Sequence, residues 1–253
     1  MGCGATQTVE MVQFNPSIYA FTYDDYKYPI EEWVKWHTLL GYDIYLLFVG
    51  ENTEKMKKIE EKYKIHVWYI KKKRELRFID YRAYYKYLAQ LTAPAGLKFM
   101  LDIDEFLPYK IPAYVKLQDG YAGSIIQRIV YKGDVYEVDE TKEMEYAINI
   151  LNKSKEKGID NISFPWRVAP MLRIHENYAQ VIQDGGNVNL GYSQNIPAIN
   201  VLHLTFKDCY EITRKSWLWL IKGNDYCASI EDLPLKKANF VYDPRLRDII
   251  SKL

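Results

Sequence analysis

The segment "KFMLDIDEFLPY", residues 98–109, places three carboxylates directly after an apolar run: Asp102, Asp104 and Glu105. In an extended chain Asp102 and Asp104 point to the same side, about 7 Å apart, while Glu105 faces away. Two carboxylates at that distance repel each other, and without compensation one of them takes up a proton. A divalent cation removes this penalty and can also neutralise a diphosphate. The spacing therefore favours a metal site holding Mn²⁺ or Mg²⁺.

A surface turn is the alternative interpretation of the same segment. In that case Asp104 would cap a helix and Asp102 would face water. D-x-D pairs also occur by chance, so the pair alone does not decide between the two. Its position directly after a buried strand favours the metal interpretation.

Motifs of other catalytic classes are missing from the sequence. No G-x-G-x-x-G follows the first predicted strand, and neither a P-loop nor a G-x-S-x-G elbow occurs. Among the histidines, His37 on an apolar helix face and His66 at a strand start are expected to be structural. His203 lies late in a strand-like segment. There an imidazole either completes an oxygen-rich metal site or packs in the core.

The elements that must position this segment alternate along the first half of the chain. Strand patterns occur at 9–14, 43–49, 65–70 and 97–101, and helix patterns at 28–41, 52–63 and 74–91. Repeated strand-helix alternation predicts right-handed crossovers and a parallel sheet covered by helices. Such sheets bind ligands at the carboxyl ends of their strands, near the point where the strand order reverses. Asp102 and Asp104 follow the fourth strand and are therefore predicted to lie at a ligand-binding edge.

The second half carries weaker patterns. Strands are predicted at 121–133 and 198–206, an amphipathic helix at 140–154 and a loop-rich stretch at 160–189. A helix at 208–223 has Asp208 and Glu211 spaced as a capping box and Gly223 as its stop. Neither a linker nor an internal repeat divides the sequence, so we expect one domain over residues 1–253.

Composition and charge bear on the class of function. Lys and Arg (34) nearly balance Asp and Glu (33), which argues against nucleic-acid binding. The longest apolar run, 44–49, is far shorter than the ~20 residues of a membrane span. Peripheral membrane association stays open, since "MGCGAT" fits an acylation pattern that also arises by chance. The scattered cysteines predict neither a disulfide framework nor a zinc site, and a reducing cytoplasm is expected: Cys3, Cys209 and Cys227.

Two stretches together resemble a known family. "EEWVKWHTLLGYDIYLLFVGEN", followed by a helix and "KFMLDIDEFL", resembles the nucleotide-sugar-binding half of GT-A glycosyltransferases of families 2 and 92. Those enzymes commonly show an "E-W-hydrophobic-x-x-H" helix, a strand ending in Asp-Asn and a "D-x-D-E-F-L" metal motif. The resemblance covers residues 29–107 well and 165–215 loosely. It implies a GT-A fold, which is α/β, Rossmann-like and has a mostly parallel central sheet flanked by helices. Residues of about 8–107 would bind the nucleotide sugar, and about 108–253 would form a loop-rich acceptor-binding half.

The resemblance also implies a reaction. A nucleoside-diphosphate sugar would lie across the strand ends, with Mn²⁺ or Mg²⁺ on Asp102, Asp104 and His203 bridging its diphosphate. A hydroxyl of a glycan, lipid or protein acceptor would attack the anomeric carbon with inversion, after a carboxylate takes its proton. Asp184 in "PMLRIHENYAQVIQDGG" stands where that base is expected. The alternative for Asp184 is a turn before Gly-Gly.

Further substrate contacts are predicted on both sides of the metal motif. Glu51 stands where an aspartate usually recognises the base, and Arg77 is expected near the nucleotide. "NVLHLTFK" resembles the family's "HY-x-x-K" element, with Leu204 replacing the aromatic residue, so Lys207 is expected near the diphosphate. The alternatives are that Arg77 faces solvent, that Lys207 is an ordinary surface lysine and that Trp166 is buried. The complete set is Phe14, Glu51, Arg77, Asp102, Trp166, Arg173 and Lys207.

Two rival functions use the same residues differently. A metal-dependent nucleotidyltransferase would employ the same carboxylates but release pyrophosphate instead of a nucleoside diphosphate. A non-catalytic module that binds carbohydrate or a partner would need the D-x-D pair only for its structure. The products, and the effect of manganese on nucleotide binding, distinguish the three.

Overall fold

The structure, a computed structural model, describes residues 16–24, 30–51, 53–77, 80–81, 83–84, 96–110, 121–159, 178–182, 191–192, 199–204 and 206–252. The strand predicted at 9–14, with Phe14 at its end, lies outside these residues. The first described strand is β1 (Ser17–Tyr23), which the sequence interpretation did not identify. Its segment "SIYAFTY" is buried along nearly its whole length, as expected for a central strand covered on both faces.

Four parallel strands form one half of the sheet, in the order β4-β1-β2-β3. The other three strands of this half agree with the predicted ones: β2 (Asp43–Val49), β3 (His66–Ile70) and β4 (Gly96–Met100). Helices α1 (Ile30–Leu39) and α2 (Glu54–Tyr63) pack on one face, where they bury Trp33, Trp36 and Ile59 against the strands. The predicted α/β class, with a parallel sheet flanked by helices, is confirmed.

The opposite face of the same strands is aromatic. Tyr19 of β1 and Tyr45 of β2 stack with their ring centroids 4.7 Å apart. Tyr45 in turn stacks on His66 and on Trp68 of β3. The ring of Tyr81 joins this cluster.

The helix predicted at 74–91 begins later than the sequence suggested. Residues 74 and 75 form a turn, residues 76 and 77 are irregular, and the described helical residues are 80, 81, 83 and 84. The Arg77 backbone N–H donates to Asp80 Oδ2 at 2.7 Å, and the Arg77 carbonyl accepts from the Asp80 N–H. Arg77 therefore lies before the helix and not inside it. The apolar period predicts burial at the start of this segment, but Leu76 is 42% exposed.

The second half of the chain extends the sheet with antiparallel strands. The full order is β11-β7-β6-β8-β4-β1-β2-β3, and β8 joins the two halves by pairing with β4 and with β6. Strand β10 lies between β5, its antiparallel neighbour, and β6, its parallel neighbour. The bounds of these strands are β5 (Glu105–Phe106), β6 (Tyr121–Tyr131), β7 (Asp134–Val138), β8 (Tyr178–Ile182), β9 (Gly191–Tyr192), β10 (Ile199–His203) and β11 (Leu235–Lys237). Strands predicted at 121–133 and 198–206 are confirmed as β6 and β10.

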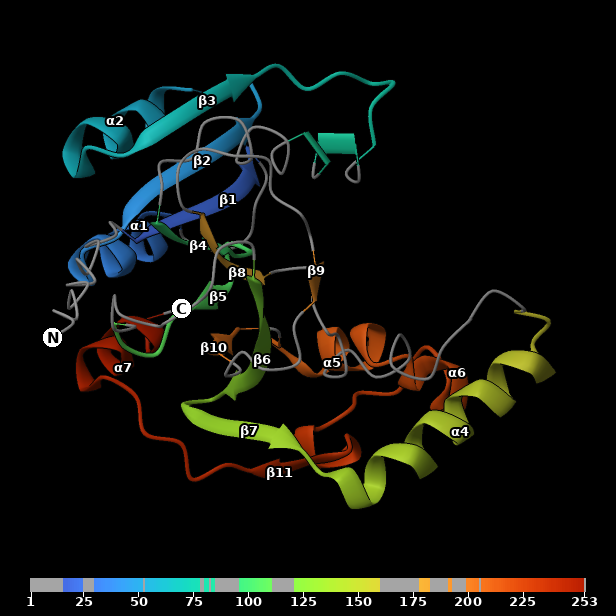
Figure 1. The fold of residues 1–253 in the computed structure, drawn as a ribbon. Coiled ribbons are helices and arrows are strands. Elements are labelled where there is room, and N and C mark those ends of the chain that lie inside the picture. The colour runs from blue at the N-terminus through green and yellow to red at the C-terminus, as the bar shows by residue number, and fades with distance from the viewer. Residues whose placement is uncertain are drawn as a thin grey trace, which may run out of the picture.

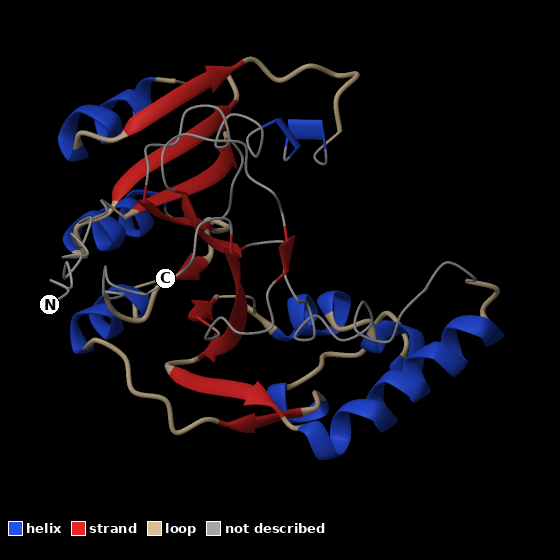
Figure 2. Cartoon of the chain, viewed as in Figure 1, coloured by secondary structure: helices blue, strands red, loops and turns tan. Residues whose placement is uncertain are grey.

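Helices lie on both sides of this band of strands. Figure 2 shows α1, α2 and α7 on one side and α4, α5 and α6 on the other. Figure 1 labels the same elements. Their bounds are α4 (Glu140–Glu156), α5 (Cys209–Lys215), α6 (Leu218–Lys222), the short 3₁₀ turn η3 (Ile230–Asp232) and α7 (Pro244–Ile250). None of the helices in the described part of the chain is long and apolar enough to span a bilayer.

The single helix predicted at 208–223 is two helices. Trp217 adopts a left-handed conformation (φ 61°) between α5 and α6, which ends one helix and starts the next. The predicted ends are nevertheless confirmed. Asp208 Oδ1 accepts the Glu211 N–H at 2.7 Å, and Gly223 closes α6 with φ 98°.

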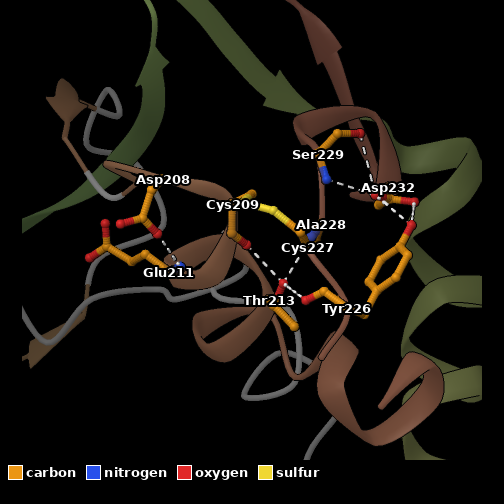
Figure 3. Close-up of a disulfide and its surroundings, with 9 residues drawn as sticks. All are labelled: Asp208, Cys209, Glu211, Thr213, Tyr226, Cys227, Ala228, Ser229 and Asp232. Carbon is orange, nitrogen blue, oxygen red and sulfur yellow. Dashed lines mark hydrogen bonds between the residues drawn. A yellow bond between two sulfur atoms is a disulfide. The ribbon is translucent and has the colours of Figure 1, made fainter. Parts of the chain in front are cut away.

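A disulfide joins Cys209, the first residue of α5, to Cys227, 18 residues later (Figure 3). The expectation that the cysteines stay unpaired is therefore wrong, and with it the reason for assuming a reducing compartment. The Thr213 hydroxyl supports the same contact, since it accepts the Ala228 N–H and lies 2.9 Å from the Tyr226 carbonyl (Figure 3). Only the fold brings the two cysteines together, because their spacing matches no framework that can be recognised in sequence.

Candidate functional site

The D-x-D segment forms a tight turn at the carboxyl end of β4. The Glu105 N–H donates to the Asp102 carbonyl at 3.0 Å, and the Asp102 N–H donates to Glu105 Oε2 at 2.8 Å. The extended geometry expected from the sequence is therefore wrong, and so is the expectation that Glu105 faces away. The buried Glu105 side chain instead turns back to hold the backbone of Asp102, while the side chain of Asp102 stays half-buried at the sheet edge.

Helix α1 holds the chain that follows this turn. Trp33 Nε1 donates to the Glu105 carbonyl and Trp36 Nε1 to the Leu107 carbonyl, each at 2.8 Å. The Leu107 N–H donates to His37 Nε2 at 3.2 Å, and His37 Nδ1 donates to the Trp33 carbonyl at 2.9 Å. Spacings of three and four residues place these side chains on one helical face. They give these buried backbone groups hydrogen-bond partners.

His37 is a structural residue, as predicted. Its side chain is buried and both ring nitrogens have backbone partners. Burial lowers the pKa of His37 to about 3, only partly opposed by its hydrogen bond to the Trp33 carbonyl. The ring is therefore neutral at physiological pH and carries no charge into the site.

His203 reaches the turn because β10 pairs antiparallel with β5, with His203 opposite Glu105. Its Nε2 atom lies 3.4 Å from Asp104 Oδ2, and both side chains are buried. Burial is the largest single influence and disfavours charge on both groups. The charge attraction and the hydrogen bond between the two side chains act against it, and in sum the pKa of His203 is raised and that of Asp104 is lowered. A charged pair therefore stands directly behind the turn, and the Leu204 N–H fixes it further by donating to the Asp104 carbonyl at 2.9 Å.

Burial weakens the acidity of Glu105. Complete burial, followed by the neighbouring charge of Asp102, raises the pKa of Glu105 to about 8. The protonated form of Glu105 is therefore favoured, and the turn carries less negative charge than its sequence suggests.

The strand order reverses between β1 and β4, and acidic residues lie where the neighbouring strands end. Asp24 follows β1, Glu51 follows β2 and Asp102 follows β4. Asp24 Oδ2 accepts the Glu51 N–H at 2.7 Å. A Cβ atom on Gly50 would lie 2.3 Å from Asp24 Cγ, so the glycine leaves room for this carboxylate. Asp24 was missed because the first strand was placed at 9–14; the apolar run 17–23 was the signal that could have revealed it.

The other predicted residues lie in different places. Arg77 is exposed and paired with Asp80 in the turn before its helix. Lys207 is exposed next to α5, where its N–H donates to Glu211 Oε2 at 2.5 Å. Glu51 is exposed at the sheet edge. The structure thus brings Asp102, Asp104 and His203 to one turn. Residues that lie outside the described part are Phe14, Trp166, Arg173 and Asp184.

Metal binding at the turn would depend on groups that a substrate supplies. Within the described ranges, no group of three or more His, Cys, Asp or Glu side chains is arranged to hold a metal ion. Mg²⁺, however, is commonly bound by one or two carboxylates together with substrate phosphates and water. Asp102, half-buried at the sheet edge, and Asp104, buried against His203, are the two carboxylates that the turn offers to such an incomplete site.

Comparisons with known proteins assign no family to this chain, so a functional argument has to start from the site. No protein-family model matches the chain, and no curated protein matches it. Solved structures that resemble it weakly include the following three. The inositol-1-phosphate CTP transferase from T. maritima has 13% identity and a TM-score of 0.31, with 50% of this chain and 60% of that chain covered. A mycobacterial protein has 12% identity and a TM-score of 0.36, with 66% and 53% covered. The apo form of the glycosyltransferase GlyE of Streptococcus pneumoniae TIGR4 has 14% identity and a TM-score of 0.30, with 59% and 40% covered.

Proposed function

We propose that this protein is a metal-dependent glycosyltransferase that moves a sugar from a nucleoside-diphosphate sugar to an acceptor hydroxyl. One observation carries the proposal, the Asp102–Glu105 turn. It lies at the carboxyl end of β4, beside the point where the strand order reverses, with the Asp104–His203 pair buried behind it. Open α/β sheets bind their ligands at this position.

Each residue of the turn would have its own role in binding the cation. Asp102 and Asp104 supply carboxylate oxygens for Mn²⁺ or Mg²⁺, and the cation, when bound, neutralises the charge of the departing diphosphate. His203 keeps Asp104 ionised and in place. Glu105 and helix α1 fix the backbone, so that the carboxylates are preorganised before substrate binds.

The remaining roles are assigned from the sequence pattern. Glu51, beside Asp24 at the end of β2, would meet the nucleobase. Asp184 would take the proton of the acceptor hydroxyl as this hydroxyl displaces the nucleoside diphosphate directly, and a single displacement inverts the anomeric carbon. The acceptor itself is a glycan, a lipid or a protein.

A panel of nucleotide sugars with Mn²⁺ tests the proposal. The released product is separated by chromatography, and we expect a nucleoside diphosphate from at least one donor. Asp102→Asn and Asp104→Asn should each lower the rate by about 100-fold or more, comparable to the loss of one preorganised electrostatic contact. Asp248→Asn, at an exposed position of α7, is the matched control and should leave the rate unchanged.

Two results would overturn the proposal in different ways. Release of pyrophosphate would identify nucleotidyl transfer on the same carboxylates. Complete inactivity, together with a lack of any manganese-dependent thermal shift with UDP or GDP, would point to a binding module in which the turn is structural.

A further inference from the structure

A cavity lies beside the chain that follows β10. Its volume is about 410 Å³, and the described residues that line it come from three places: the end of β6 with its turn, the chain after β10, and the end of α7. They are Val130, Tyr131, Lys132, Gly133, Leu204, Phe206, Lys207, Ile250 and Ser251. The volume falls within the range typical of small-molecule sites.

The cavity has an apolar floor and a basic rim. Val130, Leu204, Phe206 and Ile250 are buried apolar residues, at most 8% exposed, and form its floor. Lys132 and Lys207 are exposed and lie at its rim. No acidic side chain is found among the described residues that line it. An apolar floor with two cations at the rim suits a ligand that has an apolar body and an anionic head.

The backbone holds Lys132 at the rim. Lys132 (φ 48°) and Gly133 (φ 83°) form the two-residue turn between β6 and β7, and both adopt left-handed conformations. Asn or Gly is preferred at the first of these positions, so a lysine there is held at some cost in backbone energy. Its ammonium lies 5.2 Å from the centroid of the Tyr131 ring, which also lines the cavity.

We propose that this cavity binds an organic phosphate, with the phosphate between Lys132 and Lys207 and an apolar group against Leu204, Phe206 and Ile250. A phosphate monoester carries nearly two negative charges at neutral pH, which matches two ammonium groups better than a carboxylate does. Leu204 contributes its side chain to the floor and its N–H to the Asp104 carbonyl. The occupant would therefore lie directly behind the D-x-D turn.

Hexyl phosphate is a suitable probe, and calorimetric titration measures its binding. We expect saturable binding about tenfold tighter than that of inorganic phosphate, because the hexyl chain fills the apolar floor. Lys132→Gln should weaken binding about tenfold by removing one charge-assisted contact. Ser251→Trp, at an exposed rim position, should block the cavity without touching either lysine. Lys142→Gln, on the exposed surface of α4, is the matched control and should bind as the wild type does.

The same assay tests whether this cavity is separate from the sheet edge at Asp102, where the nucleotide sugar is proposed to bind. Asp102→Asn should bind hexyl phosphate unchanged, which keeps this proposal independent of the proposed glycosyl transfer. Sedimentation with vesicles of phosphatidic acid in phosphatidylcholine then distinguishes the source of the phosphate. Vesicle binding that is lost in Lys132→Gln indicates a lipid headgroup, whereas hexyl phosphate binding without vesicle binding indicates a free organic phosphate.

Three outcomes would overturn the proposal. They are absence of saturable hexyl phosphate binding, equal weakening by Lys132→Gln and Lys142→Gln, and loss of binding in Asp102→Asn. The last outcome would show that the cavity belongs to the nucleotide edge. Thermal melting of each variant confirms that it is folded before its binding is compared.

Discussion

At the scale of single residues, Gly50 and Asp24 depend on each other. The Asp24 carboxylate occupies the space that a Cβ on Gly50 would need, and it holds the Glu51 N–H. Gly50→Ala should therefore displace the carboxylate and lower the free energy of unfolding by about 1.5 kcal/mol. In an Asp24→Ala background the same change should cost less than about 0.5 kcal/mol, because the obstacle is gone. Urea unfolding of the four proteins measures this coupling, and equal costs in both backgrounds would contradict it.

His37 gives a pH dependence whose sign follows from its burial. Its pKa falls from the ordinary histidine value of 6.5 to about 3 in the folded protein. Between these values the unfolded chain binds the proton and the folded protein does not, so stability is lost as the pH decreases through this window. The slope approaches about 1.4 kcal/mol per pH unit, or roughly 2 kcal/mol between pH 7 and pH 5. His37→Gln cannot titrate, and urea unfolding should show a correspondingly flatter pH profile for it; parallel profiles would refute the assignment.

At the scale of elements, helix α1 explains why its sequence pattern accompanies the D-x-D motif. The indoles of Trp33 and Trp36 and the ring of His37 all bond to the backbone of residues 105–107. The apolar period alone predicted that this face is buried. It did not predict hydrogen bonds to a segment about 70 residues away, because such pairing depends on the strand register.

The disulfide is the element-scale feature with the largest expected effect on stability. It closes a loop with a sequence separation of 18 between α5 and the chain before η3. A loop of that length restricts the unfolded chain enough to contribute about 3 kcal/mol. The double variant Cys209→Ser/Cys227→Ser should lose that amount in urea unfolding without reductant, while Cys3→Ser should behave as the wild type. Identical stability of the double variant and the wild type would show that the Thr213 hydrogen bonds alone hold the contact.

How far the sequence could predict these elements depends on how local their causes are. The strand and helix periods of β2, β3, β4, α2 and α4 are local, and each was recovered near its true bounds. The turn at Asp102 was expected to be extended, although the hydrogen bonds that close it, between Asp102 and Glu105, are local. The interruption between α5 and α6 at Trp217 and the Cys209–Cys227 disulfide depend on contacts made by the whole fold. No local sequence pattern predicts either of them.

At the scale of the whole molecule, one core connects the two halves of the chain. Leu246 and Ile249 of α7 belong to the same buried cluster as Ile18 of β1 and Trp33 of α1. Ile103, inside the D-x-D turn, belongs to it as well. The candidate site is therefore supported by residues from both ends of the described chain, although the motif itself is short.

Leu246 offers the sharpest test of this connection. It is fully buried, whereas Val241 in the preceding segment is 82% exposed. Leu246→Ala should lower the free energy of unfolding by about 3 kcal/mol, while Val241→Ala should change it by less than about 0.5 kcal/mol. If the chain is one cooperative domain, the amides of β1 and β2 in Leu246→Ala should exchange with deuterium on the order of 100-fold faster. Unchanged exchange in β1 and β2, with faster exchange confined to α7, would mean that the two halves unfold separately. The single-domain expectation would then fail, because the shared core would not be coupling the halves.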